Sequence, residues 1–205
     1  MTDYFALLGE IRRPWIEPEA LKNKFLSLST QCHPDRVHEQ GEQARQAANS
    51  KYAELNAACQ CLSNTKNRLL HLIMLESGAR PSDIQRIPPG TMEYFMEVAQ
   101  LCKQVDQFLA ERKQVTSPLL KVQLFEEGMD WGDKIFALRK KLSTISNGFE
   151  DELKNINPFW NAAAELSPAR SKVLPLERLE QIYRTMSFLS RWESQLQEKS
   201  VLLTI

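Results

Sequence analysis

The side chains best suited to chemistry in this chain are a histidine and an aspartate on either side of one proline, at residues 33–35. His33 can donate and accept hydrogen bonds at once near neutral pH, and the carboxylate of Asp35 can pair with an arginine through two hydrogen bonds. Pro34 stiffens the backbone between them, which lowers the entropy lost on docking. A His/Asp pair also occurs in catalysis, but no nucleophile is suggested nearby. The tripeptide is therefore either a presented binding site or a helix-ending turn.

The four cysteines, at positions 32, 59, 61 and 102, do not have a spacing typical of metal or redox sites. Cys59 and Cys61 are two residues apart in a segment that we expect to be helical, so their side chains diverge by about 200°. A thiol also packs well as a small apolar side chain. We therefore expect structural roles, no bound metal and no cofactor. Four free thiols fit a reducing compartment.

Composition excludes several classes of function. Of the 205 residues, 42% are hydrophobic and 25% are charged, and the 26 basic and 26 acidic residues cancel. No overall field therefore favours nucleic acid or anionic lipid. Residues 1–5 lack the start of a secretory signal, and the longest apolar stretch, 69–75, is far shorter than the ~20 residues that cross a bilayer. We expect a cytoplasmic protein that binds neither nucleic acid nor membranes.

Apolar residues recur at intervals of three and four over most of the chain, which predicts an all-α fold. The helical segments expected in the first part of the chain are a short one ending at Gly9, then 19–32, 42–62 and 66–76. Alanines on the third segment let it approach the second closely, as an antiparallel hairpin. Residues 33–35 then lie at the tip of this hairpin, where binding residues are usually displayed.

A linker and a second helical region follow. Residues 79–90 contain three prolines and a glycine, so they are the predicted domain boundary between a domain at 1–78 and another at 91–205. The amphipathic segments expected beyond the linker are 92–113, 118–154 and 175–203. None can bury its apolar stripe alone, so they should pack as an antiparallel three-helix bundle. Residues 155–174, which include two prolines, are expected to be irregular.

The order of the N-terminal features resembles the J domain of DnaJ-type co-chaperones. The segment Tyr4-Phe5-Ala6-Leu7-Leu8-Gly9 precedes the long helix, the His-Pro-Asp sequence follows it, and the next helix ends in Tyr52 to Leu62 with Asn56-Ala57 inside it. The resemblance covers about residues 2–76. It implies that His33, Pro34 and Asp35, with Arg36, bind an Hsp70 where its nucleotide-binding and substrate domains meet, and help to trigger ATP hydrolysis. Chemistry would stay in the Hsp70, so this chain is expected not to be an enzyme.

The helix before the tripeptide departs from the pattern of this family. J domains usually present lysines and arginines there to an acidic Hsp70 surface, whereas this helix offers Lys22 and Lys24, then an uncharged run from Ser27 to Cys32. The resemblance implies Hsp70 contacts for both lysines, and the alternative is that they are solvated surface charges. Each charged contact with the Hsp70 that is lost from this helix should weaken the binding free energy by about 0–1 kcal/mol, by an amount that depends on salt. We therefore expect weaker or more selective pairing with Hsp70.

The chain as a whole is similar to the HscB family of iron–sulfur cluster co-chaperones, in which a short linker joins a J domain to a three-helix bundle. The segments that carry the likeness are Asp3 to Gly9, Asn67 to Gly78, Glu93 to Glu97, Trp160 to Ala164 and Phe188 to Glu193. The likeness implies two partners, an HscA- or DnaK-like Hsp70 and an IscU-like iron–sulfur scaffold protein. The zinc-binding cysteine segment of some eukaryotic relatives is absent from this sequence.

In that family the bundle holds the scaffold protein through an apolar patch near the start of its first helix and a phenylalanine on its last. The matching positions here are Phe95, Met96, Ala99 and Phe188. The first three can share one helix edge, and an exposed aromatic and methionine cluster suits docking. Alternatively, Phe95 and Phe188 belong to the core. Ala99 stands where the family prefers leucine, which leaves open a J protein with another client, or a helical adaptor whose His-Pro-Asp sequence is vestigial.

Overall fold

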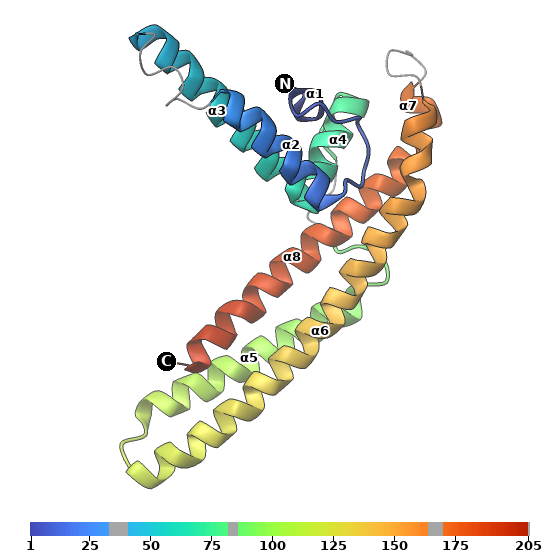
Figure 1. Ribbon diagram of the computed structural model, residues 1–205. Coiled ribbons are helices and arrows are strands. Elements are labelled where there is room, and N and C mark those ends of the chain that lie inside the picture. The colour runs from blue at the N-terminus through green and yellow to red at the C-terminus, as the bar shows by residue number, and fades with distance from the viewer. Residues whose placement is uncertain (33–40, 82–85, 164–169, 205) are drawn as a thin grey trace. The chain divides into compact units, whose positions relative to one another are not determined.

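The computed structural model describes residues 1–32, 41–81, 86–163 and 170–204, and every regular element in these ranges is a helix. The helices are α1 (Tyr4–Leu7), α2 (Pro18–Gln31), α3 (Glu42–Ser63), α4 (Thr65–Ser77), α5 (Met92–Gln114), α6 (Pro118–Ala162), α7 (Arg170–Val173) and α8 (Leu176–Thr204) (Figure 1). The all-α prediction is confirmed, and the predicted helices differ from the observed ones mainly in where they end.

The helices form two compact units. The first comprises Met1–Ser82 and Glu150–Tyr183, and the second comprises Asp83–Phe149 and Arg184–Ile205. Helices α6 and α8 each contribute residues to both units, so the first unit is assembled from two separate stretches of the chain. The domain boundary that the sequence suggests, a linker at residues 79–90 between domains at 1–78 and 91–205, remains a prediction.

In the first unit, α3 packs against α1, α2 and α4. Helices α2 and α3 run antiparallel as a hairpin (Figure 1), in which Ala48 and Ala58 are buried and allow the close approach. Helix α2 begins at Pro18, whose fixed torsion suits a first turn. Helix α4 ends at Ser77, and its C-cap residue Gly78 adopts a left-handed conformation with a φ of 75°, which suits glycine.

The second unit is a bundle of α5, the first part of α6 and the last part of α8. Its core contains Val98, Leu101 and Val105 of α5, Ile135, Leu138 and Leu142 of α6, and Phe188, Leu189, Trp192 and Leu196 of α8. These spacings of three and four are those of a helix that buries one stripe. Ion pairs also join the helices of the bundle. Lys141 Nζ of α6 lies 2.7 Å from Glu97 Oε1 of α5, and Lys199 Nζ of α8 lies 2.6 Å from Asp106 Oδ1 of α5.

One sequence expectation was wrong. Residues 155–162, predicted to be irregular, continue α6, and Pro158 lies inside the helix. A proline within a helix removes a backbone hydrogen bond, but tertiary packing outweighs that loss here. Leu153 and Trp160 are almost fully buried, and the side chain of Asn157 accepts from Trp15 N at 3.0 Å and donates to Trp15 O at 2.9 Å. The same stretch also holds the short α7.

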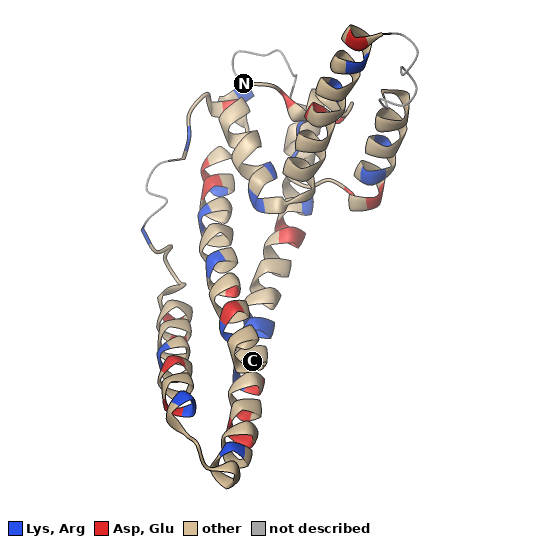
Figure 2. Ribbon diagram, turned by 90° about the vertical axis from the view of Figure 1, so that its left-hand side faces the viewer, with Lys and Arg blue, Asp and Glu red and all other residues tan. Residues whose placement is uncertain are grey.

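Charged residues of both signs are distributed along the helices (Figure 2), which agrees with the balanced composition. Over the described ranges, no helix has both the length and the apolar content that are needed to cross a membrane.

Candidate functional site

The His-Pro-Asp sequence joins the two helices of the hairpin. Helix α2 ends at Gln31, and its C-cap residue Cys32 donates from its backbone N–H to Leu28 O at 3.3 Å. Helix α3 begins at Glu42. His33, Pro34, Asp35 and Arg36 lie outside the described residues. Their Hsp70-binding role therefore remains a prediction that rests on their place between α2 and α3.

The two lysines predicted to meet an Hsp70 occupy different environments. Lys24 Nζ lies 2.7 Å from Glu10 Oε1 and donates to Gly9 O at 2.8 Å. The Glu10 side chain is only 3% exposed, so Lys24 compensates a nearly buried carboxylate of its own chain. Lys22 lies 3.8 Å from Glu19, and both of these side chains are largely exposed. Lys24 thus has a structural role that the sequence did not reveal, whereas Lys22 is largely exposed, and the Hsp70-binding role of both lysines stays a prediction.

Helix α1 is held against α4 by a histidine that sequence reasoning did not single out. His71 Nε2 accepts a hydrogen bond from Tyr4 N at 3.1 Å, and the two rings stack with their centroids 4.6 Å apart. Burial lowers the pKa of His71, Asp3 opposes this shift, and Arg12 adds to it. A neutral imidazole is required here, because a protonated one has no lone pair to accept from Tyr4.

Arg68 fastens the start of α4 to neighbouring chain segments. Its guanidinium donates to Pro14 O at 2.8 Å, to Leu62 O, and to Thr65 Oγ1 at 3.2 Å. Burial lowers the pKa of Arg68 to about 10, which Glu150 partly opposes. The side chain is 4% exposed, and every one of its partners in these three bonds is an uncharged oxygen. Arg68 therefore orders the hairpin scaffold and is not available to a partner protein.

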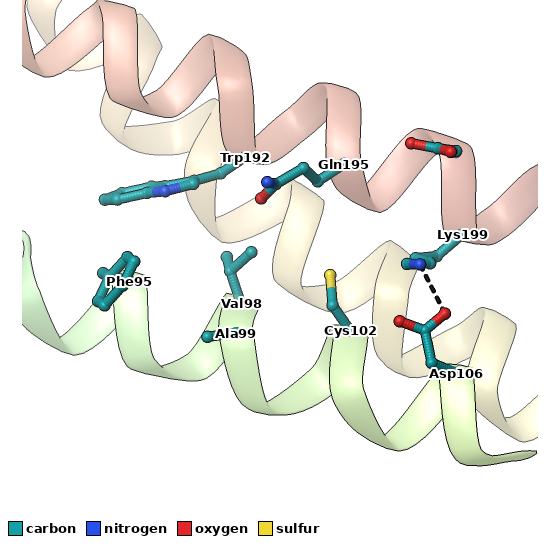
Figure 3. Close-up of a pocket in the computed structure, with 9 residues that line it drawn as sticks. Phe95, Val98, Ala99, Cys102, Asp106, Trp192, Gln195 and Lys199 are labelled. Atoms are coloured by element: carbon teal, nitrogen blue, oxygen red, sulfur yellow. Dashed lines mark hydrogen bonds and ion pairs between the residues drawn. The ribbon is translucent and has the colours of Figure 1, made fainter. Parts of the chain in front are cut away.

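A groove between α5 and α8 lies in the second unit (Figure 3). It has a volume of about 350 Å³, and its lining includes Phe95, Val98, Ala99, Cys102 and Trp192. The rings of Phe95 and Trp192 lie 6.3 Å apart at a tilt of 43°, and the ion pair of Asp106 with Lys199 closes one end. Burial raises the pKa of the Cys102 thiol, so it is an apolar part of this wall.

The structure separates the four residues predicted to bind the client. Phe95 is half-buried and Ala99 is exposed, and both line the groove. Met96, the next residue on α5, is 60% exposed. Phe188 is only 7% exposed and belongs to the bundle core, where its ring lies 5.8 Å from Trp192 and is covered by Arg191. Phe188 is therefore a core residue, which is the alternative that the sequence left open for it. Phe95, Met96 and Ala99 of α5 remain accessible. Their client-binding role stays a prediction.

Across the described part of the chain, no three histidine, cysteine, aspartate or glutamate side chains gather in a way that could hold a metal ion. The four cysteines are free and partly buried.

Comparisons with known proteins point to one group of chaperones. No protein-family model matches the chain. It is 25% identical over 156 residues to the iron–sulfur cluster co-chaperone protein HscB homolog of Arabidopsis thaliana, which covers 76% of this chain and 57% of that protein. It is 24% identical over 194 residues to human DnaJ homolog subfamily C member 4, which covers 86% of this chain and 76% of that protein. The chain thus spans little more than half the length of the Arabidopsis relative.

Solved structures share the fold. Chaperone HscB from Vibrio cholerae matches with a TM-score of 0.59 at 19% identity, over 96% of each chain. Human co-chaperone protein HscB matches with a TM-score of 0.56 at 18% identity, over 98% of this chain and 83% of that one. Where the name of one of these relatives or solved structures states a role, that role is chaperone or co-chaperone and not an enzyme activity. The chain is therefore similar in sequence to HscB and DnaJ co-chaperones, and it shares the all-α fold of the solved HscB structures.

Proposed function

We propose that this chain is a co-chaperone that stimulates ATP hydrolysis by an Hsp70-family chaperone through His33, Pro34 and Asp35. The observation that supports this most directly is that the tripeptide connects α2 and α3 of a hairpin in a chain with the HscB fold. Helices α1 and α4 both pack against α3, so the two helices that flank the tripeptide belong to a braced scaffold, on which binding residues are commonly carried. The chemistry belongs to the Hsp70, and this chain supplies the docking energy.

We further propose that the bundle delivers an iron–sulfur scaffold protein to the same Hsp70. This part is supported by the name of the Arabidopsis relative and by the accessible edge of α5, where Met96 is exposed beside the groove that Phe95 and Ala99 line. Apolar and aromatic side chains of this kind are suitable anchors for a partner protein. A chain that holds both proteins raises the effective concentration of one near the other.

A second candidate is a J protein that brings Hsp70 to a different client. The burial of Phe188 favours it, because one of the four positions that match the HscB client surface is not accessible. The likeness to human DnaJ homolog subfamily C member 4 is compatible with this reading.

Single-turnover ATP hydrolysis by the Hsp70 proteins of the source organism tests both candidates. We expect the chain to stimulate at least one Hsp70, and the scaffold protein to increase the stimulation further. The Met96→Asp variant should lose only the scaffold-dependent part, and His33→Gln should lose all stimulation. Stimulation that is indifferent to scaffold would favour another client. A His33→Gln variant as active as the unaltered chain would show that the tripeptide is vestigial.

A further inference from the structure

One face of α6 carries an apolar stripe that the bundle of the second unit does not cover. The four side chains that form this stripe are between 60% and 68% exposed, and they are Val122, Phe125, Met129 and Phe136. Met129 lies about 180° around the helix axis from Leu138, because each residue of an α-helix turns by about 100°. Leu138 belongs to the bundle core, so the stripe faces solvent on the opposite side of α6.

The spacing of the stripe is that of a coiled-coil seam. Val122, Met129 and Phe136 are seven residues apart and occupy the a position of a heptad, and Phe125 occupies the d position that follows Val122. The next d position is Gly132, where no atom lies within 4 Å of an added Cβ. A seven-residue apolar repeat on an exposed face fits a second helix that runs alongside it.

The charged residues beside the seam favour a second copy of this chain in the parallel orientation. Lys121 occupies the g position before Val122, and Glu126 occupies the e position after Phe125. Both charged side chains are exposed, and neither forms an ion pair within the ranges that the structure describes. In a parallel, in-register pair, each g residue lies beside the e residue five positions later in the other copy. Lys121 would therefore meet Glu126 on both sides of the seam.

The antiparallel orientation brings like charges together instead. If two copies were centred on Met129, Glu126 of one copy would lie beside Asp133 of the other, and like charges at an interface are unfavourable. In the parallel pair, Asp133 lies beside Gly128 and meets no charge. Charge complementarity thus selects the orientation as well as the occupant.

We propose that the chain forms a dimer in which the α6 stripes of two copies pack in parallel about a two-fold axis. The pairing is self-complementary, because each copy supplies the same seam and both members of the ion pairs. The four apolar side chains expose roughly 500 Å² in each copy, so a dimer that also covers the flanking charges would bury roughly 1,000–1,200 Å². This area is at the low end for a specific interface, so we expect a Kd on the order of 10 μM.

Two features of the second unit make such a dimer compatible with the rest of the molecule. Helix α6 is already folded on the bundle, so association does not have to supply the free energy of helix formation. The groove between α5 and α8 contains none of the four stripe residues in its lining. The dimer is therefore a property beyond the proposed function, and it leaves the predicted client surface open.

Sedimentation equilibrium of the full chain, at about 1–300 μM, tests the proposal. We expect the mean mass to rise from that of a monomer to that of a dimer over this range. Phe125→Asp should raise the Kd by about tenfold or more, because it places a carboxylate from each copy in the apolar seam. Phe159→Asp is the matched control, since Phe159 is a 54% exposed phenylalanine of the same helix but lies outside the seam. It should leave the Kd unchanged, and circular dichroism should show full helicity for both variants.

Charge reversal tests the orientation. Lys121→Glu and Glu126→Lys, each by itself, should raise the Kd by about fivefold at low salt, because each places like charges at both ion-pair positions. An equimolar mixture of these two variants should associate as tightly as the unaltered chain, because a mixed pair again has opposite charges at both positions. No gain in the mixture would overturn the inference, as would a Phe125→Asp variant that dimerises like the unaltered chain. A chain that stays monomeric at about 300 μM would also overturn it, and would leave the stripe to a different protein.

Discussion

The buried ion pair between Arg170 and Glu76 gives the sharpest test of how the first unit is held together. Arg170 Nε donates to both carboxylate oxygens of Glu76, at 3.1 and 2.9 Å, and the two side chains are only 5% and 3% exposed. The guanidinium also donates to Ala163 O. Through this one residue, α7 and the end of α6 are tied to α4.

Replacing Arg170 by methionine keeps most of the packing volume but leaves the carboxylate of Glu76 without its counter-ion. Breaking a buried pair in this way costs about 3–5 kcal/mol of the free energy of unfolding. In a chain of this size about 1 kcal/mol corresponds to 2–4 °C, so Tm should fall by roughly 6–20 °C. Adding Glu76→Gln removes the uncompensated charge, so the double variant should be more stable than Arg170→Met alone.

The assay is urea denaturation followed by circular dichroism and by tryptophan fluorescence. Lys154→Met is the control, because Lys154 forms an exposed pair with Asp151 at 2.9 Å and its loss should cost no more than about 1 kcal/mol. The reasoning is refuted if Arg170→Met lies within about 1 kcal/mol of the unaltered chain, or if the double variant is no more stable than the single one.

Three further predictions concern other parts of the chain. Because burial lowers the pKa of His71 in the folded state, its contribution to stability is present above its unfolded pKa of about 6.5 and is lost as pH falls towards the folded value. Urea midpoints at pH 7.5 and 5.5 should therefore differ less in His71→Gln than in the unaltered chain, and an equal difference would argue against it. Lys24→Met should cost about 1–2 kcal/mol, because nearly buried Glu10 loses a charged hydrogen bond, without lowering maximal Hsp70 stimulation; a loss of stimulation in a stable variant would instead assign Lys24 to docking. Gly132→Ala should stabilise the chain by about 0.5–1 kcal/mol in urea denaturation, because Gly132 lies within α6 with no atom within 4 Å of an added Cβ; destabilisation would show that the open space is needed.

The features that the sequence predicted well depend on local physics. The spacing of Val98, Leu101 and Val105 follows the helical period, so both the helix and its buried stripe could be found without a structure. Pro18 and Gly78 mark a helix start and a helix end because their backbone preferences are intrinsic to the residue. The place of residues 33–35 between two helices followed from the same signals.

The features that the sequence did not predict depend on partners far away along the chain. Pro158 indicates a helix end locally, yet α6 continues because Trp160 is buried in the first unit. Lys24 looks like any surface lysine until Glu10 is placed beside it. Phe188 has the residue type of a docking anchor, and only the packing of Trp192 and Arg191 around it shows that it is enclosed. Helical periodicity identifies an apolar stripe but not which stripe residues stay exposed.

The discontinuous make-up of the first unit has a consequence for how the chain folds during its synthesis. Trp15 is bonded to Asn157, and Glu76 to Arg170, across 142 and 94 residues of chain. At about 5–20 residues per second, ribosomes release the N-terminal helices several seconds before these later residues emerge. Until then the hairpin must be held by α1 to α4 alone, with Glu76 hydrated. We therefore expect the nascent unit to stay open at these two contacts until the later residues emerge, and to complete its fold by closing a long loop.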